Sequence, residues 1–281
     1  MRLRRYALGL AVLLALRGAT KELKIEQGRV AQSEDGVSMA NQDFLPGDTA
    51  YFSFRLSGYE VQEMVDLREK VHLGYHVEIR DPSGVLVEAP IAGEIATNVS
   101  PEDKGWMPKI RFKLAVPAYA ISGTYHVSIQ AQDDVDKSKA TSEIPFAVHG
   151  GPAENSAKLE IRDFQFLRAP DDRKPLQIAA YRPGDTVWVR FDIAGYQLGG
   201  QNRLDVDYGV TVLRPNGEVM YSKSPAATEK TQSFYPQRWV PGILSLTLDK
   251  DLAPANYTLI VSAHDAVGNQ TCELRKTFDA E

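Results

Sequence analysis

Four aspartates near the ends of predicted strands are the residues best suited to metal chemistry in this 281-residue sequence. Asp133, Asp134 and Asp136 form a cluster, and Asp265 is the counterpart of Asp133 in a second copy of the same pattern. Carboxylate oxygens are ligands of calcium, which takes about six to eight of them. Aspartate is equally common in tight turns, because its side chain accepts hydrogen bonds from nearby backbone N–H groups. We predict turn chemistry, with no bound metal or cofactor, and keep a calcium site as the alternative.

Three histidines of the first half are the second candidate. His72 and His76 alternate with Glu78 along one predicted strand, and His126 lies on a strand expected to be its neighbour. Imidazoles on adjacent strands could hold zinc. The second half carries no histidine at the matching positions, so the arrangement is not part of a shared design. We interpret these residues as solvated strand histidines.

Tryptophans are the binding candidates. Trp106 and Trp239 each stand in a Trp-x-Pro sequence within a predicted loop, and Trp188 falls on the outward face of a predicted strand. An exposed aromatic ring can stack on a sugar or anchor a protein partner. Because Trp-x-Pro occurs in both halves, the alternative is structural: each ring covers the open end of its own domain.

No catalytic motif accompanies these residues. The sequence lacks the short motifs of nucleotide-binding loops, zinc proteases and serine hydrolases. Its one cysteine, Cys272, lies in a strand pattern without a catalytic context, and a single cysteine forms no disulfide within the chain. We interpret it as a packed strand residue, with a reactive or intermolecular thiol as the alternative. The prediction is a protein that is not an enzyme.

An internal repeat organises the elements that carry these side chains. Residues 44–49 (Phe-Leu-Pro-Gly-Asp-Thr) return as residues 181–186 (Tyr-Arg-Pro-Gly-Asp-Thr), 137 residues later. Proline and glycine together favour a tight turn. Each copy leads into an alternating strand, whose inward residues are Phe52, Phe54, Leu56 and Val189, Phe191, Ile193. The period is that of a whole domain, so one fold is predicted to occur twice.

Further alternation predicts strands over residues 71–79 and 204–212, each followed by a hairpin turn and a short strand at 85–86 or 219–221. A longer polar loop is predicted next, before each Trp-x-Pro. Helical periodicity is missing, apart from a short helix or turn at 61–70. About seven strands in about 125 residues are typical of a β-sandwich.

The N-terminus predicts export. Residues 1–5 are basic, and residues 6–16 form an apolar run of 11, too short for the roughly 20 residues of a membrane-spanning helix. Residues 1–19 are therefore predicted to be a signal peptide, with an uncleaved anchor as the alternative because Arg17 occupies the −3 position. The destination would be secreted or periplasmic. A net charge of −5 argues against nucleic acid or anionic lipid as the main partner.

The closing hairpins resemble bacterial immunoglobulin-like and fibronectin type III-like modules. Residues 252–257 and 261–269 look like the E–F corner, the F strand and the F–G turn of those families. The resemblance implies that Tyr125 and Tyr257 are corner tyrosines, whose hydroxyls return to nearby backbone. Residues 181–187 also resemble the opening of macroglobulin-type domains. The Cys-Gly-x-x-x-Gln thioester motif is missing, so protease trapping is not implied.

The predicted architecture is all-β, with a signal peptide (1–19), a first immunoglobulin-like β-sandwich (20–149), a linker (150–157) and a second sandwich (158–281). The predicted function is that of an exported, non-catalytic binding or spacer protein that acts through sheet edges and end loops. Its partner would be a protein or a cell-envelope polysaccharide. The alternative is a carbohydrate-binding accessory protein of a polysaccharide-processing system.

Overall fold

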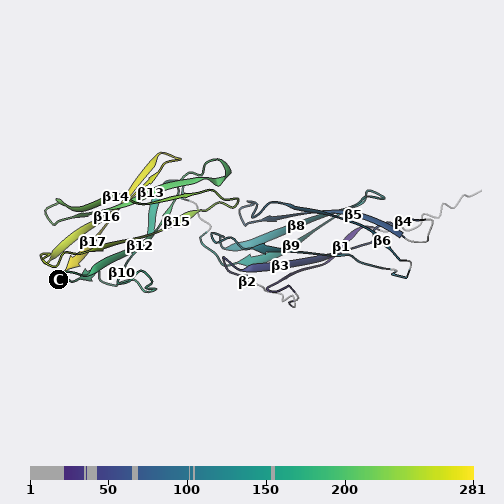
Figure 1. Ribbon diagram of the computed structural model, residues 1–281, viewed down its shortest axis with the longest axis horizontal. Helices are drawn as coiled ribbons and strands as arrows, with labels where there is room; N and C mark the ends of the chain where they lie inside the picture. The colour runs from purple at the N-terminus through teal and green to yellow at the C-terminus, as the bar shows by residue number, and fades with distance from the viewer. Residues whose placement is uncertain are drawn as a thin grey trace, which may run out of the picture.

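The computed structural model describes residues 22–34, 36, 43–64, 69–100, 102–103, 105–152 and 156–281. The predicted signal peptide and residues 153–155 of the predicted linker lie outside these ranges. Figure 1 shows two bodies of β-strands arranged end to end along the long axis. The only helix among the described residues is one short 3-10 segment, η1 (Gly200–Asn202).

The first sandwich consists of two facing sheets. One has the order β1 (Lys24–Ala31), β3 (Thr49–Ser57), β7 (Lys109–Ala115). The other has the order β2 (Asp43–Phe44), β9 (Lys139–Val148), β8 (Gly123–Asp133), β5 (Glu69–Arg80), β4 (Gln62–Glu63), and β6 (Ile91–Val99) also pairs with β5.

The second sandwich repeats this plan. Its three-stranded sheet has the order β10 (Glu160–Leu167), β12 (Thr186–Ala194), β15 (Trp239–Thr247). Its five-stranded sheet has the order β11 (Ala180–Tyr181), β17 (Gln270–Ala280), β16 (Ala255–Asp265), β13 (Leu204–Leu213), β14 (Val219–Thr231). The chain thus folds as two tandem immunoglobulin-like sandwiches, which confirms the predicted fold class.

Each sandwich has its own hydrophobic core, built by strands that alternate as their sequences predict. In β3 the side chains of Phe52, Phe54 and Leu56 are buried between the sheets, and the equivalent residues of β12 are buried in the second sandwich. Burying such side chains contributes roughly 1.5–3 kcal/mol each. The alternation in the sequence therefore sets which face of each strand turns inward.

The repeated Pro-Gly-Asp stretch forms the same turn in both copies. The amide of Leu45 donates to the carboxylate of Asp48 at 2.8 Å, and the amide of Arg182 donates to that of Asp185 at 2.9 Å. The glycine between them, Gly47 in the first copy, has a φ of +92°, in the region that favours glycine. The turn therefore depends on the aspartate and the glycine.

The two predicted corner tyrosines are confirmed. The hydroxyl of Tyr125 donates to the carbonyl of Ile121 at 3.1 Å, and that of Tyr257 donates to the carbonyl of Ala253 at 2.9 Å. Both rings are buried. Each hydroxyl thus ties the connection before its strand to the body of its sandwich.

Two local predictions were wrong, and a third is only partly tested. Residues 85–86 make only an isolated bridge between Leu86 and Arg80, whereas β6 and most of β14 occupy the segments predicted as polar loops. Both are sparsely buried strands at sheet edges, so their alternation is weak. In the segment predicted as a short helix or turn (61–70), residues 62–63 form β4 and pair with residues 69–70 at the start of β5, and residues 65–68 between them lie outside the described chain.

Candidate functional site

The most elaborate group of polar side chains lies where the two sandwiches meet, and it starts from Asp81. This aspartate follows β5 and opens the turn predicted at 81–84. One carboxylate oxygen, Oδ1, accepts hydrogen bonds from the amides of Ser83 at 2.8 Å and Val85 at 2.9 Å. The carboxylate is thereby held in place by its own turn.

The other oxygen of Asp81 binds the second sandwich. Oδ2 accepts hydrogen bonds from the hydroxyl of Tyr235 at 2.9 Å and from Nη2 of Arg238 at 2.6 Å. The side chains of Asp81 and Arg238 are 0% and 8% exposed. A buried carboxylate needs hydrogen-bond donors on both oxygens, because an unpaired charge away from water costs several kcal/mol.

Tyr235 inserts into the first sandwich, although it belongs to the second half of the chain. Its ring is buried in the core cluster of the first sandwich, and its hydroxyl lies 3.5 Å from that of Tyr125. The guanidinium carbon of Arg238 lies 6.0 Å from the centre of the Tyr235 ring. Burial, followed by the Tyr125 hydrogen bond, raises the pKa of Tyr235. The phenol therefore stays neutral at physiological pH and donates to Asp81.

Trp239 covers the linker where the two sandwiches meet. We call this contact region, built around Asp81, Tyr235, Arg238 and Trp239, the joint. Its ring meets that of Tyr119, from the first sandwich, edge-on with centroids 5.4 Å apart. A Cβ atom on Gly151 would lie 2.3 Å from this indole, so the linker passes directly beneath the ring. The amide of Gly151 also donates to the carbonyl of Ala120 at 2.9 Å. The linker is therefore fastened to both sandwiches.

A pocket of about 390 Å³ lies beside the joint. Val85 of the first sandwich lines it together with Tyr196, Gln237 and Arg238 of the second. The hydroxyl of Tyr196 donates to the carbonyl of Gln237 at 2.8 Å, and burial raises the pKa of this phenol. The polar groups nearest the pocket thus bond to one another, and they hold the shape of the loop that carries Arg238.

The three predicted tryptophans are not brought together. Trp106 is half-buried against the core of the first sandwich, and its carbonyl accepts the hydroxyl of Tyr59 at 2.5 Å. Trp239 packs at the joint. Trp188 is half-buried on β12, where it pairs with Leu167 and Ser245. Because the rings of Trp106 and Trp239 are already packed, we do not propose either as a sugar platform.

The predicted aspartates act on the backbone. Asp133 accepts hydrogen bonds from the amides of Glu60 at 2.6 Å and Val135 at 2.8 Å. Asp265 does the same for Gln197 at 2.8 Å and Val267 at 2.9 Å.

The neighbours of Asp133 are also engaged. Asp134 bonds Lys137 at 3.2 Å, which lowers the pKa of that carboxyl, and Asp136 accepts the amide of Ser138 at 2.8 Å, with the same effect on its own pKa. No group of three or more His, Cys, Asp or Glu side chains in the described chain is arranged to hold a metal.

The histidines of the first sandwich each have a separate acidic neighbour. His72 lies 3.6 Å from Asp134, His76 lies 3.4 Å from Glu78, and His126 bonds Glu143. The three imidazoles thus have different acidic neighbours on one sheet face, and they do not converge on a common point.

Sequence reasoning missed the residues of the joint, although the repeat carries a signal for them. The second copy has Arg214 where the first has Asp81, and the first copy has Gly105 where the second has Arg238. These differences mark the pair as specific to the inner ends of the two sandwiches.

Comparisons with known proteins add little. No protein-family model matches the chain, and a search of curated proteins finds no match. Among solved structures, the chain is similar to the C-terminal domain of the AgI/II polypeptide BspA of Streptococcus agalactiae, with 11% identity and a TM-score of 0.31. The alignment covers 92% of this chain and 99% of that one. A likeness this distant establishes neither a shared fold nor a shared function. No helix in the described ranges is long and apolar enough to cross a membrane.

Proposed function

We propose that this chain is an exported, non-catalytic binding or spacer protein whose two sandwiches are held in one fixed relative orientation. Residues 20–149 and 158–281 are the two modules, and residues 1–19 are the export signal. Export is inferred from the basic and apolar pattern of the N-terminus. The spacer role is inferred from the buried contacts at the joint.

The buried contact of Asp81 with Arg238 and Tyr235 is the observation that carries this proposal. Two sandwiches on a free linker would share few contacts and would reorient easily. Here a reorientation would pull Arg238 from a carboxylate that is buried in the other sandwich. Breaking a buried pair in this way typically costs about 3–5 kcal/mol. The joint therefore favours one distance and one angle between the outer ends, which is what a spacer requires.

The test is a distance measurement between the sandwiches. Spin labels on Lys139→Cys and Lys276→Cys, in a Cys272→Ser background, place one probe on an exposed position of each sandwich. Pulsed dipolar spectroscopy of the otherwise native protein should give one narrow distance distribution. Arg238→Met should broaden it, because the guanidinium that fastens the loop to Asp81 is lost.

Arg275→Met is the matched control, since this arginine is exposed on β17 and its one bond within the described ranges is to Glu273 at 3.4 Å. It should keep the narrow distribution. A distribution that is already broad in the native protein, or one that stays narrow in Arg238→Met, would contradict the proposal.

A further inference from the structure

The outward face of the sheet β1-β3-β7 in the first sandwich gathers cationic side chains. Cross-strand pairing places Arg29 and Arg111 on either side of Ser53, Arg55 opposite Lys109, and Lys113 opposite Tyr51. Adjacent strands lie about 4.8 Å apart, so the two arginines stand roughly 10 Å from each other with the serine hydroxyl between them. This face is strongly positive in a chain whose net charge is −5.

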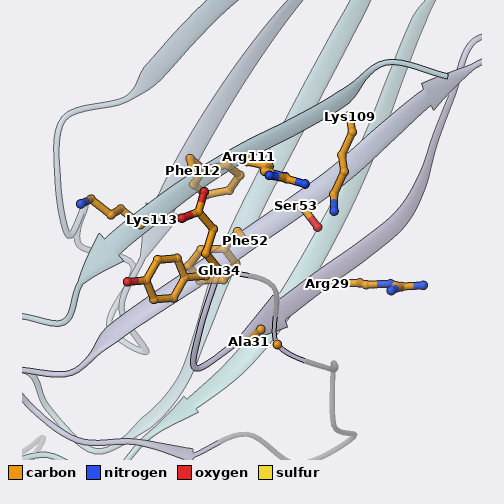
Figure 2. A pocket seen from close by; sticks show the side chains of 11 residues that line it. Arg29, Ala31, Glu34, Phe52, Ser53, Lys109, Arg111, Phe112 and Lys113 are labelled. Carbon is orange, nitrogen blue, oxygen red and sulfur yellow. The ribbon is translucent and has the colours of Figure 1, made fainter.

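A pocket of about 400 Å³ opens on this face. Four cationic side chains and one carboxylate, that of Glu34, line it among the described residues. Figure 2 shows the nitrogen ends of Lys109 and Arg111 turned toward the hydroxyl side of Ser53, while Lys113 points the other way along β7. Tyr51 and Ser53 of β3 also line the pocket.

The arrangement costs free energy in the absence of an anion. Arg55 stands between Lys109 on β7 and Glu26 on β1, and its Nη1 donates to the carbonyl of Met107 at 2.9 Å, so the carboxylate of Glu26 offsets part of this charge. Along β7, Lys109, Arg111 and Lys113 recur at every second residue, about 7 Å apart. Neither lysine forms an ion pair with another described residue. An extended polyanion along β7 would place negative groups beside the two lysines and relieve the repulsion between them.

The second sandwich is the internal control. Strand pairing, rather than the Trp-x-Pro alignment, gives the equivalent outward positions: Pro241, Ile243 and Ser245 pair with β12 where Lys109, Arg111 and Lys113 pair with β3. Its central strand carries one cation, Arg190, which donates hydrogen bonds to the side-chain oxygen of Gln165 at 2.8 Å and to the carbonyl of Asp172 at 3.3 Å. The cationic row is therefore not required by the fold and belongs to the first sandwich alone.

We propose that this face binds a linear acidic polysaccharide, whose carboxylate or sulfate groups pair with the row of cations along β7. The regular spacing over three alternate residues suits an extended polyanion better than a single small anion. Tyr51 and Ser53 supply the ring surface and the hydroxyl that sugar units bind. None of the exposed large apolar side chains of the described chain lines the pocket, so no residue is placed to insert into a membrane. A single aromatic ring is also too little for a platform of stacked nucleic-acid bases.

This site goes beyond the proposed spacer function, because a rigid joint needs no anion site. The two proposals rest on different residues, so either can fail while the other stands.

The test is a titration of the full chain, with calorimetric detection, at about 50 mM salt. The probes are a galacturonic acid decamer, a heparin-derived decamer and a neutral dextran of equal length. Both acidic probes, or one of them, should bind, and the dextran should not. The comparison of the two acidic probes shows whether carboxylate or sulfate is preferred. Raising the salt to about 200 mM should weaken the binding severalfold, because the contacts are between exposed charges.

Lys109→Gln/Lys113→Gln should weaken binding about tenfold, since each exposed charge contact contributes a few-fold. Lys223→Gln/Lys276→Gln is the matched control, because it removes the same charge from exposed positions of the second sandwich. It should bind within about twofold of the native protein. Glu34→Gln should bind a few-fold more tightly. The double lysine variant should melt at the native temperature or above it, because it relieves repulsion, so its loss of binding cannot come from unfolding.

Four outcomes would overturn the proposal: neither acidic probe binds, the control double variant loses as much affinity as Lys109→Gln/Lys113→Gln, poly-L-glutamate binds more tightly than both glycans, or single-stranded DNA does. The third result would assign the face to an acidic protein segment, and the last to nucleic acid.

Discussion

The carboxylate of Asp81 and the guanidinium of Arg238 lie 2.6 Å apart, although 157 residues separate them in the chain. Each belongs to a connection rather than a strand, and each stands at a position where the other repeat has a residue of different chemistry, Arg214 or Gly105. The outer ends of the protein therefore lack the pair that joins the inner ends. The joint is a specific contact between two sandwiches that otherwise share one fold.

Replacing Arg238 should destabilise the first sandwich more than replacing an exposed arginine. Arg238→Met leaves the carboxylate of Asp81 buried without its cation, and we expect a loss of about 3–5 kcal/mol in the free energy of unfolding. The double variant Asp81→Asn/Arg238→Met should lose less than the two single variants together, because neither charge is then left alone. Urea unfolding of the four proteins measures the cycle. Arg275→Met should change stability by less than about 1 kcal/mol, and additive losses in the cycle would contradict a direct interaction.

Adding one methyl group to the linker should loosen the joint. A Cβ on Gly151 would lie 2.3 Å from the Trp239 ring, so Gly151→Ala should displace the indole and cost about 1–3 kcal/mol. The near-ultraviolet circular dichroism of the tryptophans should change with it. In a Trp239→Ala background, Gly151→Ala should cost little further stability, because the ring that its Cβ would meet is gone.

Gly74→Ala is the control for this substitution, since a Cβ at that position meets no atom within 4 Å. Its spectrum should match that of the native protein. If Gly151→Ala were as stable as Gly74→Ala, the close approach of Trp239 to the linker would be wrong.

The architecture could be predicted because it depends on local patterns that occur twice. Alternation places Phe54 and Phe191 inside their sandwiches, and the corner role of Tyr125 and Tyr257 follows from a resemblance carried by residues close in sequence. The edge strand β6 was missed because its local pattern is unclear. Its inward face alternates in the structure, with Ile91 and Ile95 packed against the core, but Gly93 and Thr97 stand between the apolar residues of that face, so the sequence shows only a weak period.

The joint could not be predicted, because local chemistry already accounted for its residues. Asp81 stands in an Asp-Pro-Ser-Gly turn, where an aspartate needs no further explanation. Only the orientation of the two sandwiches brings Arg238 to it. The cationic face is an intermediate case. The alternation of Lys109, Arg111 and Lys113 is visible in the sequence, but Arg29 joins them only through a register shift between Glu26 and Arg29.

Cys272 should be a slow nucleophile. Burial raises the pKa of its thiol from 9.0 to about 11. At pH 8 the native protein would then hold roughly 100-fold less thiolate than the unfolded chain, and the thiolate is the reactive form. Labelling with a chromogenic disulfide should be at least about tenfold slower in native protein than in urea, and it should accelerate as the pH rises toward 11. Equal rates in both states would show that the thiol is exposed and reactive.

Stability should fall in strong alkali because buried phenols must stay protonated. Burial raises the pKa of Tyr181 to about 12, and it raises those of Tyr125 and Tyr235 as well. A pKa that is higher in the folded state than the unfolded value near 10 gives a contribution that is complete below pH 10 and is lost as the pH rises toward the folded value. Melting temperatures measured between pH 8 and 12 should therefore be level at first and then decline. Tyr235→Phe should melt lower than the native protein at pH 8, because the hydrogen bond to Asp81 is gone, and should decline less steeply above pH 10. An unchanged slope in this variant would mean that the phenol of Tyr235 ionises as easily in the joint as in water, which a buried donor to a carboxylate cannot do.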